Sequence, residues 1–464
     1  MVLFPTLLFL ASAVSSPSAP QGHGPGPSGP QEHQELDGLP ELRGLHELRG
    51  LIGLGDQIQS GTVLEVKALG VDDHGNWSAR LRILEPSGGA PYGIVRNGTL
   101  LLTRQAPAQT IESAPQSVFF SSFTTVGFQG DRVVSFGGVT NLAPSTSGSF
   151  RNGICFDTVP ALLMTDSPGE PFSTEAAYVE VFANLRANDA GDVLATNCVA
   201  DGAFVGEVLQ SFQFRKGALV GQRTLDRAGP FVPELIDLNA HGRAVWGAVG
   251  SFGSSADEVL LDGQVLAASG DPIPGAGAFW SRFTAADLND AGAVVLRGFS
   301  TAASFVATRD RVVARSGASV AAGSAARFRF FGDGPFASSF RRELRPRLLT
   351  DGSVVFYADV TDEDTGDSWA GLFREDELLV ATGDVVQGLA SAPAGASITV
   401  LGTQSGGFAV SPNGRYVLFD AALDDDPQAA LCLLDRGAAS LRKGALEKRS
   451  SRKRRSAALE GVRR

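Results

Sequence analysis

The chain has 464 residues, of which 43% are apolar, with 56 Gly, 24 Pro and a formal net charge of −11. This length is too great for one ordinary compact core unless the fold is closed or repetitive. Ten basic and two acidic residues between Arg442 and Arg464 give that tail a charge of +8 and leave −19 on the rest, an acidic body that repels nucleic acid.

The N-terminus begins with an apolar run from Val2 to Leu10, followed by the small residues Ala11 to Ala13. The pattern is typical of a secretory signal peptide, predicted over 1–15, although no basic residue precedes the run. The alternative is a buried N-terminal strand. The Pro- and Gly-rich stretch 16–44 predicts a disordered linker and favours export, to the cell surface, the periplasm or the medium. The apolar run is too short to span a bilayer, so we expect no transmembrane segment in the mature chain.

A turn followed by an apolar strand recurs along the chain. Its glycines are Gly75, Gly130, Gly191, Gly242, Gly292, Gly352 and Gly414, separated by 50 to 62 residues. Asn188, Asn239 and Asn289 begin three of these turns, where an Asn side chain can bond the backbone two residues on. The glycine then supplies a positive φ at little steric cost. Seven near-regular copies indicate an internal repeat.

A second motif follows each turn, with two apolar strands joined by a two-residue polar turn. Asn97-Gly98 and Asp262-Gly263 are strong hairpin signals. A less regular segment, such as "SITVLGTQ", provides a fourth strand before the next turn. Four antiparallel strands in a unit of this length are the pattern of a β-propeller blade, whose faces are covered by its neighbours in the ring.

The two ends of the repeat region predict how the ring closes. "LIGLGDQI", from Leu51 to Ile58, matches "VLAASGDPI" and "LLVATGDVV" later in the chain, which lie in the back halves of units. The last unit, which starts at Gly414, has a front half, but the repeat pattern is lost before its back half is complete. We therefore predict an all-β, seven-bladed β-propeller over 45–440, with N-terminal strands completing the last blade and a basic disordered tail over 441–464.

The Asn-x-x-Gly turns, together with "LLVATGD", resemble a family of exported bacterial tandem-repeat proteins, largely uncharacterised. "SPNGRYVLF", from Ser411 to Phe419, is similar to the SPDG-type turn of Tol-B-like propellers. The resemblance covers 48–437 and implies architecture, with almost nothing about activity. Members often carry a C-terminal surface anchor, but the tail here lacks the apolar helix that an anchor needs.

The loop "DVTDEDTGDSW" is the most charged local feature. Asp362, Asp364 and Asp367 are hard oxygen ligands and make this loop a candidate Ca²⁺ site, the only cofactor that the sequence suggests. A solvated hairpin loop is the alternative. "DEDTGDSW" also resembles the Asp box of sialidase-like propellers, a structural turn in that family. The Asp424 to Asp426 run is interpreted as another exposed loop.

Histidine and cysteine give no metal pattern. His74 and His241 occupy the same place in two repeat turns and are interpreted as turn residues. Cys155 and Cys198 form a disulfide in an exported protein or, with Cys432, serve as buried apolar residues. The basic tail either increases solubility, contacts an anionic surface or docks on the acidic body.

The sequence leaves three functional hypotheses open. The first is a non-enzymatic exported propeller that binds an unknown protein or glycan partner through loops at the blade ends, because loops on rigid scaffolds carry recognition. The alternative is a glycosidase or lyase that acts on polysaccharide with channel carboxylates, none of which a motif singles out. The third is a structural surface-layer component.

We expect a monomer and no nucleic-acid partner. An exposed cluster of Trp77, Trp246, Trp280 and Trp369 would indicate sugar stacking, although Trp246 is expected in a strand core.

Overall fold

The computed structural model describes residues 47–437, except 60, 104–106, 109–117, 130–131, 141–149, 157–158, 164–176, 179–182, 189, 202–203, 216–217, 228–230, 232–234, 249–255, 322–323, 332–343, 390–394, 403–406 and 425. The predicted signal peptide, the linker and the tail lie outside these residues. The elements named within the described residues, β1 to β33, are all strands, so the all-β prediction is confirmed.

The described strands form sheets that follow the chain. Sheet 1 holds β2 (Gln57–Ile58), β3 (Gly61–Val71), β4 (Trp77–Leu84), β5 (Tyr92–Arg96) and β6 (Thr99–Thr103). Sheet 2 holds β7 (Pro107–Ala108), β8 (Val118–Gln129), β9 (Arg132–Thr140), β10 (Phe150–Phe156) and β11 (Val159–Leu163). Sheet 3 holds β12 (Ala177–Tyr178), β13 (Ala183–Ala187), β14 (Asp192–Asp201), β15 (Phe204–Arg215) and β16 (Ala218–Asp226).

The remaining strands continue the same plan. Sheet 4 holds β17 (Asp237–Leu238), β18 (Ala244–Ala248), β19 (Glu258–Leu261) and β20 (Gln264–Ala268). Sheet 5 holds β21 (Arg282–Leu288), β22 (Val294–Phe299), β23 (Ser304–Thr308) and β24 (Val312–Arg315). Sheet 6 holds β25 (Ala326–Phe330), β26 (Arg347–Leu348), β27 (Val354–Asp362), β28 (Ser368–Arg374) and β29 (Glu377–Ala381). Sheet 7 holds β30 (Ile398–Leu401), β31 (Phe408–Val410), β32 (Tyr416–Leu423), β33 (Asp426–Asp435) and, from the N-terminus, β1 (Glu47–Ile52).

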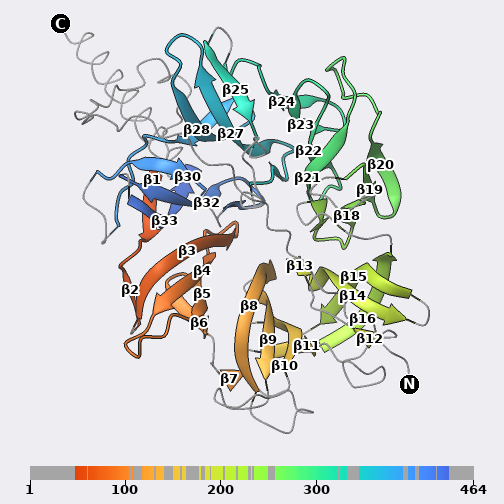
Figure 1. Ribbon diagram of the computed structural model, residues 1–464, viewed down its shortest axis with the longest axis vertical. Coiled ribbons are helices and arrows are strands. Elements are labelled where there is room, and N and C mark those ends of the chain that lie inside the picture. Colours follow the sequence, from red (N-terminus) through yellow and green to blue (C-terminus); the bar gives the residue numbers. More distant parts are fainter. Residues whose placement is uncertain are drawn as a thin grey trace, which may run out of the picture. The chain divides into compact units, whose positions relative to one another are not determined.

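Each sheet touches the next one in chain order. Strand β8 contacts sheet 1, β13 contacts sheet 2, β17 contacts sheet 3, β21 contacts sheet 4 and β26 contacts sheet 5. The series continues with β30 against β28, and β3 returns to sheet 7 through β31, β32 and β33. Figure 1 shows the sheets following one another around a common axis. The fold is therefore a propeller arrangement.

The two ends of the described chain meet in sheet 7. Strand β1 pairs antiparallel with β33, with Leu48 opposite Leu434 and Gly50 opposite Cys432. On its other side, the Gly50 amide donates to the Gln387 carbonyl at 2.7 Å. This confirms that an N-terminal strand completes the sheet made by the C-terminal strands.

The apolar core lies in layers between neighbouring sheets. On β32 and β33, alternate side chains point to opposite faces, as the period of two in a strand requires. Phe419 and Cys432 pack towards sheet 6, whereas Leu418 and Leu433 pack towards sheet 1. A sheet buried on both faces cannot be stable alone, so the neighbours stabilise one another.

The repeat turns that the structure describes have the predicted backbone, and Gly130 lies outside the described residues. Gly191, Gly242 and Gly292 have φ of 94°, 75° and 81°, and each donates its amide to the carbonyl three residues earlier. The tight hairpins are also confirmed, since Asn97, Gly98, Asp262 and Gly263 all have positive φ. The two motifs are joined, because Asn97 Oδ1 accepts from the Trp77 amide and Asp262 Oδ1 from the Ala244 amide.

The turn asparagines make a second contact that the sequence did not reveal. Asn188 Nδ2 donates to the Asn239 carbonyl at 2.7 Å, Asn239 Nδ2 to the Asn289 carbonyl at 3.1 Å, and Asn289 Nδ2 to the Leu349 carbonyl at 3.0 Å. These carbonyls occupy the same place in successive turns. We call this chain of bonds the asparagine ladder. It ties sheets 3, 4, 5 and 6 together.

Replacing Asn239 by Asp separates the two roles of this side chain. Asp keeps the oxygen that accepts from the His241 and Arg243 amides, but it loses the donor and places a carboxylate against the Asn289 carbonyl. We expect Asn239→Asp to lower the free energy of unfolding by about 1–3 kcal/mol, the cost of an unsatisfied buried group. Denaturant unfolding measures this. A variant as stable as the wild type would show that the ladder contributes nothing.

Candidate interaction face

The antiparallel order of the strands gives the sheets two different ends. One end, here the turn face, carries the repeat turns and the tight hairpins. The other, the loop face, carries the connections within and between sheets, including 85–91, 269–281, 300–303, 363–367, 382–389 and 395–397. These loops differ in length, whereas the described repeat turns that close at Gly191, Gly242 and Gly292 are alike.

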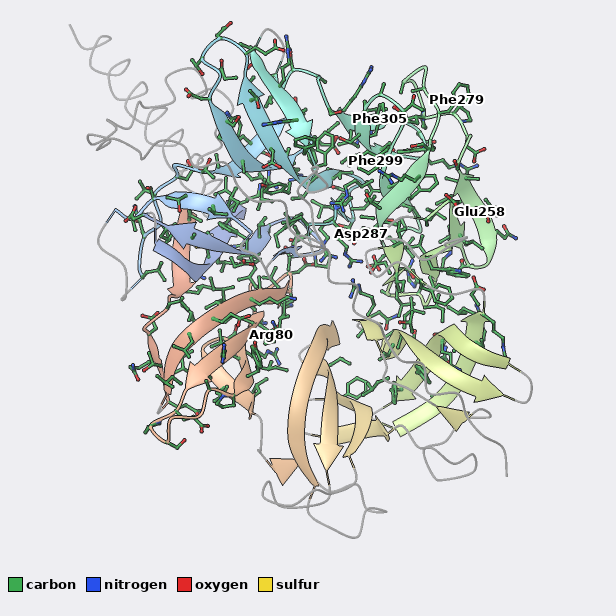
Figure 2. All side chains as sticks on the ribbon, viewed as in Figure 1. Arg80, Glu258, Phe279, Asp287, Phe299 and Phe305 are labelled. Atoms are coloured by element: carbon green, nitrogen blue, oxygen red, sulfur yellow. The ribbon has the colours of Figure 1, made fainter. Side chains whose placement is uncertain are left out.

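The axis near the turn face holds a buried cluster of charges. Arg345 is 6% exposed, donates through Nη1 to the Ile236 carbonyl, and lies with Nη2 3.3 Å from Asp237 Oδ1 and 3.5 Å from Asp287 Oδ1. Arg347 Nη1 pairs with Asp287 Oδ1 at 3.2 Å. Figure 2 shows Asp287 towards the inner side of the sheets. We call these four residues the axial cluster. It joins sheets 4, 5 and 6.

Both carboxylates also accept backbone amides from the next sheet. Asp237 Oδ2 accepts from Leu288 at 2.9 Å, and Asp287 Oδ2 accepts from Leu348 at 2.7 Å. Burial, followed by the negative charge of Asp237, raises the pKa of Asp287 to about 6 against the opposing effect of the two arginines. Burial also pushes the pKa of Asp237 upwards, but Arg345 and Arg347 outweigh it and hold this pKa below the usual range. The carboxylates are therefore used in joining sheets.

The raised pKa of Asp287 has a consequence for stability. Because the folded protein binds this proton more readily than the unfolded chain, the contribution of Asp287 to folding grows as the pH falls through 6 and is complete below the ordinary Asp pKa of 3.8. Asp287→Asn removes this titrating group. We therefore expect the free energy of unfolding of the wild type, relative to that of Asp287→Asn, to be higher at pH 4 than at pH 7 by up to about 3 kcal/mol. Urea titrations at both pH values measure it. A difference that does not change with pH would contradict the raised pKa.

A third repeated element shapes the loop face. Gly55, Gly270 and Gly383 have φ of 83°, 92° and 92°, and each is followed by an Asp whose carboxylate accepts a backbone amide three residues earlier. The residue two after each Asp is buried: Ile58, Ile273 and Val386. These corners connect the outer strand of one sheet to the first strand of the next. They hold the intervening loops on the loop face.

Exposed apolar side chains gather on this face. Eight large hydrophobic residues are exposed among those whose side chains the structure describes. Leu64, Leu84, Tyr92, Phe279, Val385 and Val400 lie in loop-face connections or in the loop-side parts of strands. Val220 and Val265 lie near the turn face. Phe279 is the most exposed of them at 62%, and Figure 2 shows it at the outer edge of the sheets.

The predicted calcium ligands lie in an exposed loop on the same face. Asp362 Oδ1 accepts from the Asp364 and Thr365 amides, so this carboxylate closes its own turn. Asp364 and Asp367 are exposed. Within the described residues, no three His, Cys, Asp or Glu side chains are grouped so as to hold a metal ion. The calcium site stays a prediction, and the solvated hairpin loop matches the observed geometry.

The other predicted residues are placed as follows. His74 and His241 lie in repeat turns, as expected, and their amides bond Asp72 and Asn239. Trp77, Trp246, Trp280 and Trp369 are at most 8% exposed, so they provide no stacking surface for a sugar. Cys432 is buried, and burial raises the pKa of its thiol. Cys155 and Cys198 lie on strands of different sheets, and their side chains are outside the described residues.

Comparisons with known proteins give no family. No family model matches the chain, and no curated protein matches its sequence. Kuenenia stuttgartiensis hydrazine synthase is similar in structure, at 9% identity over 82% of this chain and 96% of its own, with a TM-score of 0.34. Trypanosoma rangeli sialidase is 9% identical over 87% of this chain and 60% of its own, with a TM-score of 0.32. A glucose dehydrogenase is 11% identical over 64% of this chain and 92% of its own, with a TM-score of 0.25.

These likenesses carry no argument about activity, because every TM-score is below 0.5. The chain spans less than two thirds of the sialidase's length. In the part of the chain that the structure describes, no helix is long and apolar enough to cross a membrane.

Proposed function

We propose that this chain is an exported, non-enzymatic, seven-bladed β-propeller that binds a protein or glycan partner through its loop face. The seven sheets and their contacts in chain order support the blade count. The apolar N-terminal run supports export, and the repeat pattern supports membership of the exported bacterial tandem-repeat family.

The observation that carries the proposal is the gathering of exposed apolar side chains on the loop face, six of the eight. Contiguous exposed apolar patches on soluble proteins mark interaction surfaces, whereas single exposed apolar residues do not. On sheet 1, Leu84 and Tyr92 lie together at the loop face. The turn face is instead closed by the asparagine ladder and by ion pairs such as Arg243 with Asp262 and Arg311 with Glu375. The turn face therefore has the features of a structural scaffold, and the loop face has those of a binding surface.

The alternative, a glycosidase that uses channel carboxylates, has less support. Asp237 and Asp287, the two carboxylates of the axial cluster, are 7% and 6% exposed and are paired with arginines. A glycosidase needs its two carboxyl groups on either side of a bound sugar. The four tryptophans are buried and cannot stack on a sugar, which also argues against a glycosidase.

The test compares two exposed apolar residues on the loop face with two on the turn face. The full chain, a loop-face variant Phe279→Asp/Val385→Asp and a turn-face variant Val220→Asp/Val265→Asp are each applied to an array of defined oligosaccharides and to a displayed library of random 12-residue peptides. We expect ligands that the wild type and the turn-face variant bind and that the loop-face variant loses. Binding lost only in the turn-face variant, or no binding at all, would contradict the proposal. Release of new reducing ends on the array would favour the glycosidase.

A further inference from the structure

The loop-side end of sheet 1 carries a row of side chains across three strands. Glu65 on β3 lies opposite Arg82 on β4, and Arg82 lies opposite Tyr92 on β5. Leu84, two residues beyond Arg82 on the same strand, is 40% exposed, and Tyr92 is 36% exposed. Because residues two apart share a strand face, Arg82 and Leu84 point to the same side as this row.

Contacts within the row leave one positive charge without a carboxylate. Glu65 pairs with Arg80 Nη2 at 3.5 Å and accepts from the Tyr92 hydroxyl at 3.3 Å. The Arg80 guanidinium lies 4.9 Å from the centre of the Tyr92 ring, and that of Arg82 lies 6.0 Å from it. Arg82 is exposed, and the ring is its partner among the described residues. Arg80 is labelled on β4 in Figure 2.

We propose that Arg82, with Tyr92 and Leu84 beside it, is the docking point for a carboxylate in an acidic, apolar peptide segment of a protein partner. The inference rests on the proposed function of the loop face and names the partner's chemistry. A guanidinium binds a carboxylate with two parallel hydrogen bonds. Tyr and Arg, with Trp, are also enriched among the few residues that carry most of the binding energy of protein interfaces.

The same geometry favours a peptide over a sugar. A sugar ring stacks on the face of an aromatic side chain, but here the guanidiniums of Arg80 and Arg82 lie over the Tyr92 ring. Leu64 and Leu84, both 40% exposed, add apolar surface that a hydrophobic side chain of a peptide can cover. The net charge of −11 repels anions in general, so binding of an acidic segment requires this local positive charge.

The experiment selects peptides from the displayed 12-residue library on the full-length wild-type chain and measures their affinities for variants. We expect enriched peptides to contain Asp or Glu next to Leu or Phe. Arg82→Ala should weaken their binding roughly tenfold or more, and Tyr92→Ala should also weaken it. The matched control is Arg309→Ala, which removes an exposed arginine in the β23–β24 hairpin on the turn face and should leave affinity unchanged.

A second measurement identifies the group that Arg82 binds. Changing the peptide's Glu to Gln should weaken binding to the wild type and have little further effect in Arg82→Ala, because the two changes remove the same interaction. Peptides that bind Arg82→Ala as tightly as the wild type would overturn the inference. Arg82-dependent binding of acidic oligosaccharides alone would also overturn it. If peptides depend on Phe279 but not on Arg82, the proposed function stands and this inference fails.

Discussion

Removal of residues 1–52 should abolish stable folding, whereas removal of residues 1–46 should leave the unfolding temperature unchanged. The longer deletion takes away β1, including Leu48, Leu51 and Ile52, which pack on the cores at both faces of sheet 7. Fully burying such a side chain contributes about 1.5–3 kcal/mol, and since Ile52 is buried and Leu48 and Leu51 are partly buried, their loss costs on the order of 4 kcal/mol. That is a large fraction of the roughly 5–15 kcal/mol that stabilises a typical domain.

The pair of deletions forms its own control, since the two proteins differ by the six residues of β1. The loss also leaves the edge of β33 without its partner strand, and unpaired edges promote aggregation. Thermal unfolding followed by circular dichroism, together with the monomer fraction on gel filtration, measures the effect. Equal unfolding temperatures for the two deletions would show that β1 does not hold the ring closed.

Substitution of Arg345 by Ala should lower the free energy of unfolding by about 3–5 kcal/mol, because it leaves Asp237 and Asp287 as buried carboxylates with less compensation. The matched control is Arg243→Ala, which breaks an exposed pair with Asp262 and should cost no more than about 1 kcal/mol. Denaturant unfolding at pH 7 gives both numbers.

The double variant Arg345→Ala/Asp287→Asn distinguishes charge from packing. Removing the carboxylate charge along with the arginine should recover part of the lost stability, because less uncompensated charge remains buried. If the double variant is less stable than Arg345→Ala by the full cost of Asp287→Asn, the axial cluster acts through packing and the electrostatic account is wrong.

The backbone of the repeat could be predicted because its signals are local. Gly191 and Gly242 mark turns that need a positive φ, and Asn97-Gly98 marks a two-residue hairpin, whatever the rest of the chain does. The pairing of β1 with β33 followed from counting half-units at each end. These features depend on spacing and turn chemistry, which a single sequence contains.

The contacts between sheets could not be predicted in the same way. Asn188, Asn239 and Asn289 were interpreted from their turns alone, yet an Asp would serve the turn equally well, as Asp72 does in sheet 1. The signal for the ladder was the preference for Asn over Asp in three successive copies. It becomes interpretable only when the next turn's carbonyl is known to lie within reach.

The axial cluster and the row of side chains around Arg82 could be predicted from the sequence only in part or not at all. Asp237, Asp287 and Arg347 stand two residues before the repeat turns, a charged position on otherwise apolar strands that the sequence displays. Arg345 has no such regularity. The row across Glu65, Arg82 and Tyr92 depends on a register shift between Val63 and Glu65, and a bulge of this kind leaves no clear sequence pattern.

Closure of the ring by the chain ends is the claim on which the rest depends, and a disulfide tests it directly. Leu48 and Leu434 lie opposite each other on β1 and β33 and pack on the same core, whereas Leu433 points to the other face. Leu48→Cys/Leu434→Cys should oxidise to an intramolecular disulfide, seen as a joined peptide by mass spectrometry, and Leu48→Cys/Leu433→Cys should not. Free thiols at 48 and 434 in the folded protein, or disulfides only between molecules, would contradict the account.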